Sequence, residues 1–113
     1  MKIKELFNSR VSYQVVVTFD LENADTSAYK NLQDALSGKL KLEKYISISK
    51  EDGGGKLDLP DNTLAALWEK DKTEKDTRLH FEKEIKSIFD TRKLRGRFLV
   101  VVAQNWSANC TTI

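Results

Sequence analysis

Three carboxylates lie close together in the sequence, at the end of an apolar segment that is expected to be a strand. They are Asp20, Glu22 and Asp25, and carboxylate oxygens are the ligands that hard cations such as Mg²⁺ or Mn²⁺ prefer. A cation held there would polarise a phosphoryl oxygen and activate a water molecule. The alternative is structural: Asp25, with Thr26 or Ser27, caps a following helix while the acids complement its dipole. Capping explains Asp20 least, since it lies five residues before the cap, and Asp20 is therefore the candidate catalytic and metal-binding residue.

Two short stretches are rich in cations and are candidates for binding nucleic acid. The first stretch contains Arg92, Lys93, Arg95 and Arg97, and the second contains Lys39, Lys41 and Lys44. Basic side chains at this density can neutralise the phosphates of a nucleic acid. The alternative is that they stabilise a helix C-terminus and form a charged turn before an apolar strand. If the second strand begins where the first helix ends, the two stretches are expected to adjoin.

The composition indicates one domain and excludes several kinds of site. A length of 113 residues fits one domain, so we expect residues 1–113 to form it, with a core over about 11–106. A single cysteine, Cys110, and a single histidine, His80, exclude a disulfide framework and the usual Cys/His metal clusters, and no organic cofactor is expected. The net charge of +2 is too small to indicate a polyanionic partner by itself. No apolar run approaches the ~18–20 residues of a membrane span and the first eight residues lack the apolar stretch of a signal peptide, so we expect a cytoplasmic protein with no membrane partner.

Apolar periodicity predicts six elements in the order β-α-β-β-α-β. The expected strands cover about residues 11–19, 42–50, 63–69 and 97–103, and the expected helices about residues 26–37 and 74–92. Gly38 is expected to end the first helix, the threonine–acid pattern at Thr73 to begin the second, and the glycine-rich residues 51–62 to form a loop or hairpin tip. Two βαβ halves joined by a hairpin give an α+β fold, the ferredoxin-like βαββαβ sandwich, in which a four-stranded antiparallel sheet carries both helices on one face.

In this fold the first and third strands are central, and the large apolar residues between the sheet and the helices form the core. The expected core consists of Val15, Val17, Phe19, Leu32, Leu36, Ile46, Ile48, Phe81, Ile85, Ile88, Leu99 and Val101. Strand parity then leaves Thr18 and Asp20 on the open face, together with Val16. An open face of this kind often binds a ligand or pairs two subunits, and apolar side chains on it would be wet in a monomer, so we expect a homodimer.

Residues 15–20 form an apolar first strand that ends in an aromatic residue followed by Asp20. In this the chain resembles the second CRISPR-associated protein family, which are small dimeric nucleases or integrase-complex subunits, and the related GhoS-type antitoxins, which are endoribonucleases. The similarity to the antitoxins includes the acidic, Ser/Thr-rich turn after Asp20, the long excursion between strands two and three, and residues 59–65 before an acid-rich helix; it covers roughly residues 13–105.

The resemblance implies a homodimer that acts on RNA as an antitoxin or endoribonuclease, with a toxin or another protein as a further partner. It also implies that Asp20 meets its twin across the dimer axis and binds Mg²⁺ or Mn²⁺. A hypothesis from a different class is a non-catalytic interaction module, a dimerisation or adaptor domain without nuclease activity, that uses the open face or a sheet edge to bind a protein partner.

Overall fold

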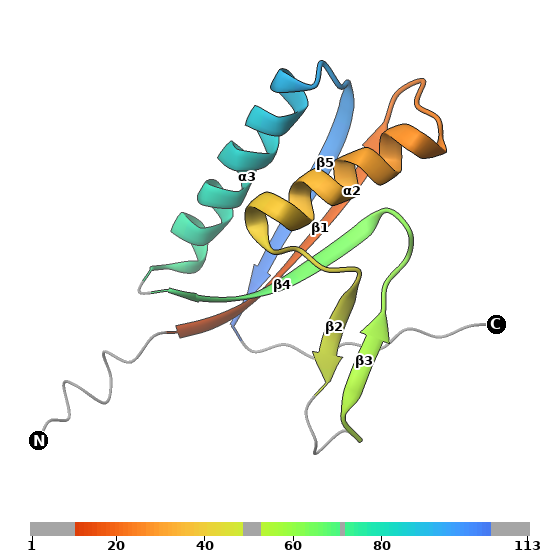
Figure 1. Ribbon diagram of the computed structural model, residues 1–113. Coiled ribbons are helices and arrows are strands. Elements are labelled where there is room, and N and C mark those ends of the chain that lie inside the picture. Colours follow the sequence, from red (N-terminus) through yellow and green to blue (C-terminus); the bar gives the residue numbers. More distant parts are fainter. Residues whose placement is uncertain (1–10, 49–52, 71, 105–113) are drawn as a thin grey trace, which may run out of the picture.

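Two helices cover one face of a three-stranded antiparallel sheet, and a two-stranded hairpin projects beside it (Figure 1). The computed structural model describes residues 11–48, 53–70 and 72–104. The elements are β1 (Val11–Leu21), α2 (Thr26–Leu40), β2 (Tyr45–Ile48), β3 (Gly55–Asp58), β4 (Thr63–Lys70), α3 (Glu74–Thr91) and β5 (Gly96–Ala103). The sheet order is β4-β1-β5, so β1 is central and antiparallel to both neighbours. The chain is a mixed α+β fold, as the sequence predicts.

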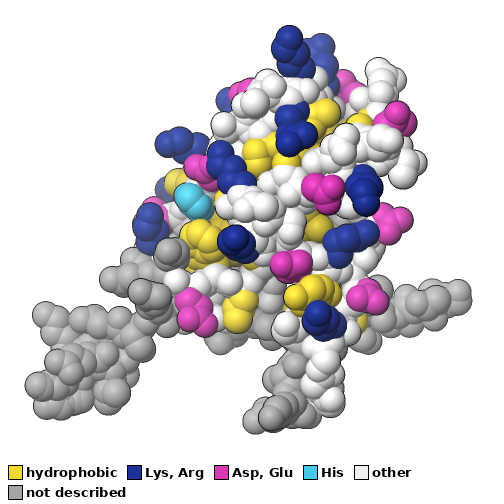
Figure 2. Space-filling model, viewed as in Figure 1, with side chains coloured by type: hydrophobic (Ala, Val, Ile, Leu, Met, Phe, Trp, Pro, Cys, Tyr) yellow, Lys and Arg dark blue, Asp and Glu magenta, His cyan; other side chains and the backbone are white. Residues whose placement is uncertain are grey.

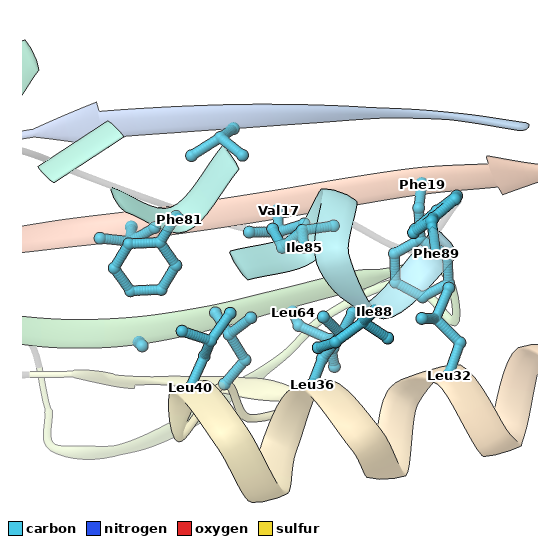
Figure 3. Packing of buried hydrophobic residues seen from close by; sticks show 14 of the residues in the cluster. Val17, Phe19, Leu32, Leu36, Leu40, Leu64, Phe81, Ile85, Ile88 and Phe89 are labelled. Carbon is cyan, nitrogen blue, oxygen red and sulfur yellow. The ribbon is translucent and has the colours of Figure 1, made fainter. Parts of the chain in front are cut away.

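The core lies between β1 and the helices because alternate residues of the strand face them. Val15 and Val17 are completely buried and Phe19 is nearly so. Figure 3 shows the leucines of α2 pointing toward β1 and toward Ile85 and Ile88 of α3. Burial of each such side chain stabilises the fold by about 1.5–3 kcal/mol, and this layer therefore fixes the helices on one face of the sheet.

Both helices begin at the residues that the sequence indicates. The Asp25 side chain accepts a hydrogen bond from the Ala28 N–H at 2.9 Å, and the Thr73 side chain accepts one from the Asp76 N–H at 3.0 Å. The prediction that Gly38 ends α2 is wrong. The helix continues to Leu40, whose buried side chain extends the apolar stripe, and a glycine inside a helix costs only about 0.5–1 kcal/mol.

The second expected strand does not join the main sheet, and the described residues form a three-stranded and a two-stranded sheet in place of the predicted four-stranded one. β2 pairs with β3, which lies in the segment expected to be a loop or hairpin tip. The hairpin is connected to β4 by one bridge, in which Glu43 and Ala65 exchange backbone hydrogen bonds of 2.7 and 2.8 Å. Because β2 and β3 pair with each other, β4 is an edge strand of the three-stranded sheet instead of a central one. Residues 49 and 50, which were expected to extend the second strand, lie outside the described residues.

The predicted core is confirmed on β1, α2, α3 and at Ile46, but it is wrong on β5. Leu99 and Val101 are 57% and 46% exposed, whereas Val100 is 7% exposed. The pairing register explains the difference: Val17 of β1 lies opposite Val100, so the even-numbered residues of β5 face the helices. The side chain of Ile48 and residues 1–10 and 105–113 of the expected domain lie outside the described residues. In the part of the chain that is described, no helix is long and apolar enough to cross a membrane.

Candidate functional site at one end of the open sheet face

The face of the sheet that the helices leave open carries an apolar strip. Its members are Val16 of β1, Leu67 of β4, and Leu99 and Val101 of β5. Val16 lies opposite Val101 in the β1–β5 register and is half-buried, and the three others are 46–57% exposed. Large apolar side chains gathered on one exposed face mark an interaction surface more often than a bare monomer surface.

Asp20 and Arg97 lie directly opposite each other at one end of this face. The register pairs them, and the Arg97 guanidinium lies 3.7 Å from a carboxylate oxygen of Asp20. The two side chains are 63% and 87% exposed, so this ion pair contributes only about 0–1 kcal/mol. The prediction that Asp20 projects from the open, polar side of β1 is confirmed by its exposure.

Tyr29 of α2 connects the helix layer to the same end of the sheet. Its hydroxyl donates to Asp20 at 3.3 Å and accepts from the Leu21 N–H at 2.9 Å, while its ring stacks on Phe19 at 5.9 Å between centroids. Tyr29 thereby holds one oxygen of the Asp20 carboxylate, whereas Arg97 lies beside the other.

Gly96 allows β5 to approach β1 closely at this point. Its φ is +153°, and a Cβ at this position would lie 2.1 Å from the Asp20 carbonyl oxygen. The backbone continues the contact beyond the strands, because the Glu22 N–H donates to the Arg95 carbonyl at 2.8 Å. The missing side chain of Gly96 therefore permits the close pairing in which Arg97 lies beside Asp20.

A shallow hollow lies beside this pair on the open face. Its lining includes Thr18, Asp20, Asn62, Arg97 and Leu99. The Thr18 hydroxyl donates to the Asn62 carbonyl at 3.2 Å, which attaches the loop before β4 to β1. The hollow combines a carboxylate, a guanidinium, and hydroxyl and amide groups with three apolar residues, Phe19, Phe98 and Leu99, a set that can hydrogen-bond a small polar group and pack against its apolar part.

The carboxylates after β1 do not form the cation site that their sequence spacing allows. Asp25 is the N-cap of α2, so its role is the structural one. Among residues 11–48, 53–70 and 72–104, no three metal-ligating side chains come together. Asp20 instead has the cation of Arg97 as its neighbour. Within the described part of a single chain, Asp20 therefore lacks the two further ligating side chains that a three-ligand site for Mg²⁺ or Mn²⁺ would need.

The first basic stretch forms an exposed turn between α3 and β5. Arg92, Lys93, Arg95 and Arg97 are all exposed, and Lys93 adopts the left-handed conformation with φ +55°. Figure 2 shows basic side chains gathered at this end of the molecule. Within the described residues, only Arg97 of these four forms an ion pair.

The second basic stretch does not form one surface with the first. Lys39 lines a groove between the helices together with Arg92, but its ammonium lies 3.0 Å from Glu84, and this hydrogen bond and charge lower the pKa of the Glu84 carboxyl. Lys41 and Lys44 line two other hollows, beside β2 and beside the start of α2 respectively. The expectation that the two stretches adjoin therefore holds only for Lys39 and Arg92.

Sequence reasoning missed three contributors to the site: Tyr29, Asn62 and Gly96. Only Gly96 carries a signal, since a glycine between two arginines at the start of an apolar strand suggests a close backbone approach. The other two depend on how the helix and the loop pack against β1. No protein-family model, no curated protein and no solved structure matches the chain.

Proposed function

We propose that the protein is a homodimeric RNA-binding protein on a ferredoxin-like scaffold, and that the exposed basic turn at residues 92–97 binds the RNA backbone. The observation that carries this proposal is the turn itself. It places four cations within six residues, and Arg92, Lys93 and Arg95 have no carboxylate partner among the described residues. Cations that are not engaged in the protein are available to phosphates.

The strand order supports the ferredoxin-like scaffold. The Glu43–Ala65 bridge lies on the side of β4 where a fourth strand would pair. If β2 followed β4 beyond this bridge, the sheet would contain four antiparallel strands with both helices on one face, which is the ferredoxin-like arrangement. The exposure of Leu99 and Val101 within the apolar strip supports the dimer, because a second copy would remove these two side chains from water.

The polar hollow at the end of the open face supports RNA in preference to a simple polyanion. Arg97 belongs both to the basic turn and to the hollow beside Asp20. A strand whose phosphates contact the turn can therefore place a sugar or base near Thr18 and Asp20. Carboxylate and amide groups of this kind read the hydrogen-bonding edges of unpaired bases.

Endoribonuclease activity of the antitoxin type is a second candidate, and the exposure of Asp20 on the open face favours it. The donor set in one chain does not fit a resident metal, so cleavage is no part of the primary proposal. A toxin could be a protein partner whether the protein only binds RNA or also cleaves it. The alternative from another class is a protein-interaction module that uses the apolar strip and has no affinity for RNA.

Fluorescence anisotropy with a labelled single-stranded RNA, at about 50 mM salt and with EDTA present, tests the primary proposal. Lys93→Gln with Arg95→Gln should weaken binding and reduce the salt slope by about 1.4, since each phosphate contact contributes about 0.7. The matched control, Lys75→Gln with Lys86→Gln, removes the same charge from exposed positions of α3 and should change the affinity much less.

Equal losses in the two double variants, or no binding by the wild type, would overturn the RNA proposal and favour the interaction module. Cleavage is measured separately, by adding Mg²⁺ or Mn²⁺ to the same complex. Cleavage by the wild type that is lost in Asp20→Asn would establish the nuclease, whereas an intact RNA would leave a binding protein.

A further inference from the structure

β5 presents an unprotected strand edge. Among the described residues it pairs with β1 on one side only. Residues 98–103 contain no charge and no proline, although charges, prolines and bulges are the features that normally prevent edge strands from pairing with another chain. An edge of eight residues with apolar side chains on both faces is a template for a further strand.

The opposite edge of the sheet is partly covered. β4 is bridged to Glu43 at Ala65, and the β2–β3 hairpin lies beside it. Glu69 adds a charge near its far end. The two edges therefore differ among the described residues: β4 is bridged to the hairpin at Ala65, whereas β5 has no partner on its outer side.

We propose that two copies of the chain pair through β5, antiparallel and with the two-fold axis at Val100, so that the two three-stranded sheets become one six-stranded sheet. This inference rests on the homodimer of the proposed function and specifies its interface. An isologous pair of this kind closes on itself and exposes no new edge at the seam.

Charge selects the antiparallel direction. β5 carries Arg97 near its start, after the basic turn, and ends at the uncharged Ala103. Antiparallel pairing about Val100 places Arg97 opposite Ala103 of the partner subunit, so the two arginines are separated by six residues of strand, roughly 20 Å, which exceeds the Debye length of about 8 Å. Parallel pairing would instead place the two arginines about 4.8 Å apart.

The exposed apolar side chains are self-complementary in the same register. Leu99 lies opposite Val101 of the partner subunit, and Val101 lies opposite the partner's Leu99. Side chains opposed in this way have Cβ atoms about 4.5–5.5 Å apart. Two of the most exposed apolar side chains of the open face thus cover each other. For this reason we expect the partner strand at the β5 edge to come from a second copy of the chain.

The arrangement has a consequence for Asp20. Asp20 lies beside Arg97, so the two Asp20–Arg97 pairs of the dimer lie at opposite ends of the β5 seam. The two carboxylates do not meet across the axis, in contrast to the implication of the family resemblance. The two basic turns are separated along one continuous sheet, and each is accessible to RNA.

Sedimentation velocity over a range of concentrations tests the interface with two matched variants. Leu99→Lys and Leu67→Lys each place a cation on the open face at a side chain that is 57% exposed, but only Leu99 lies on β5. We expect Leu99→Lys to weaken dimerisation at least tenfold and Leu67→Lys to leave it nearly unchanged, with both variants folded by circular dichroism. Hydrogen exchange should show protection of β5 amides that increases with protein concentration.

Three results would contradict the interface. Loss of the dimer in both variants would mean that the open faces pack together, and retention in both variants would place the interface elsewhere; either result overturns the β5 seam while the homodimer stands. A wild type that is monomeric at every concentration would overturn the homodimer itself, and the RNA-binding measurement would then decide separately whether the rest of the proposed function survives.

Discussion

Replacing Gly96 by Ala should destabilise the protein more than its small change in volume suggests. The φ of +153° is unfavourable for any residue with a Cβ, which costs about 1–3 kcal/mol. The added methyl group would lie 2.1 Å from the Asp20 carbonyl oxygen and 2.9 Å from the Leu21 Cα. These are backbone atoms of the central strand and cannot rotate away, so overpacking adds about 1–3 kcal/mol.

The sum, about 2–6 kcal/mol, is a large part of the roughly 5–15 kcal/mol by which a domain of this kind is stable. Urea unfolding followed by circular dichroism measures it, and with an m-value of about 1–3 kcal/mol/M the midpoint should fall by at least about 0.7 M. Gly38→Ala is the control, because no atom lies within 4 Å of its added Cβ. That change should stabilise α2 by about 0.5–1 kcal/mol.

A loss below about 0.5 kcal/mol in Gly96→Ala, which is the usual range for surface substitutions, would refute the reasoning. It would show that β5 does not approach the backbone of β1 this closely. The register that brings Arg97 beside Asp20 would then lose its structural basis, and so would the pairing register proposed for two β5 strands.

Two further predictions concern the parity of β5 and the pH dependence of stability. Ile85→Ala, at a completely buried position, should lower the free energy of unfolding by about 2–5 kcal/mol. Leu99→Ala, measured in dilute, monomeric protein, should change it by no more than about 0.5 kcal/mol. Similar losses for the two variants in denaturant titrations would mean that β5 faces the other way. Lys39→Gln should lower the melting temperature slightly at pH 7, and the difference should disappear in acid. The pKa of Glu84 is lowered in the folded state, so the stability that its carboxylate contributes is fully present above the ordinary pKa of 4.5 and is lost as the pH falls through the lowered pKa. If the melting temperatures of the wild type and Lys39→Gln differ by the same amount at pH 7 and in strong acid, the Lys39–Glu84 pair is not the cause.

The orientation of an element could be predicted where its apolar residues recur at a clear spacing, and it could not be predicted where they do not. The odd-numbered residues of β1 from Tyr13 to Phe19 are apolar and its even-numbered ones are mostly polar, and α3 repeats its apolar residues at helical spacing, so the sequence contains their orientation. β5 is apolar at every position from Phe98 to Ala103, and alternation then carries no information about which residues face the helices. That choice is made by pairing with β1, which is more than 70 residues away in the chain.

The same distinction applies to the site. The exposure of Asp20 follows from the parity of one strand and could be predicted. The position of Arg97 beside Asp20 depends on the register between β1 and β5, and the contact of Asp20 with Tyr29 depends on how α2 packs against the sheet. β3 was missed because its four residues lie in a polar, glycine-rich segment that forms a strand only through its pairing with β2.

The central place of β1 also determines the order in which the protein can be completed during synthesis. β1 leaves the ribosome first, but one of its partners is β4 and the other is β5, the last strand of the sheet. Both edges of an apolar strand therefore remain unpaired while most of the chain is being made, and such edges expose a nascent chain to aggregation. Complete pairing of β1 must therefore wait until β5, which follows the second helix in the chain, has been synthesised.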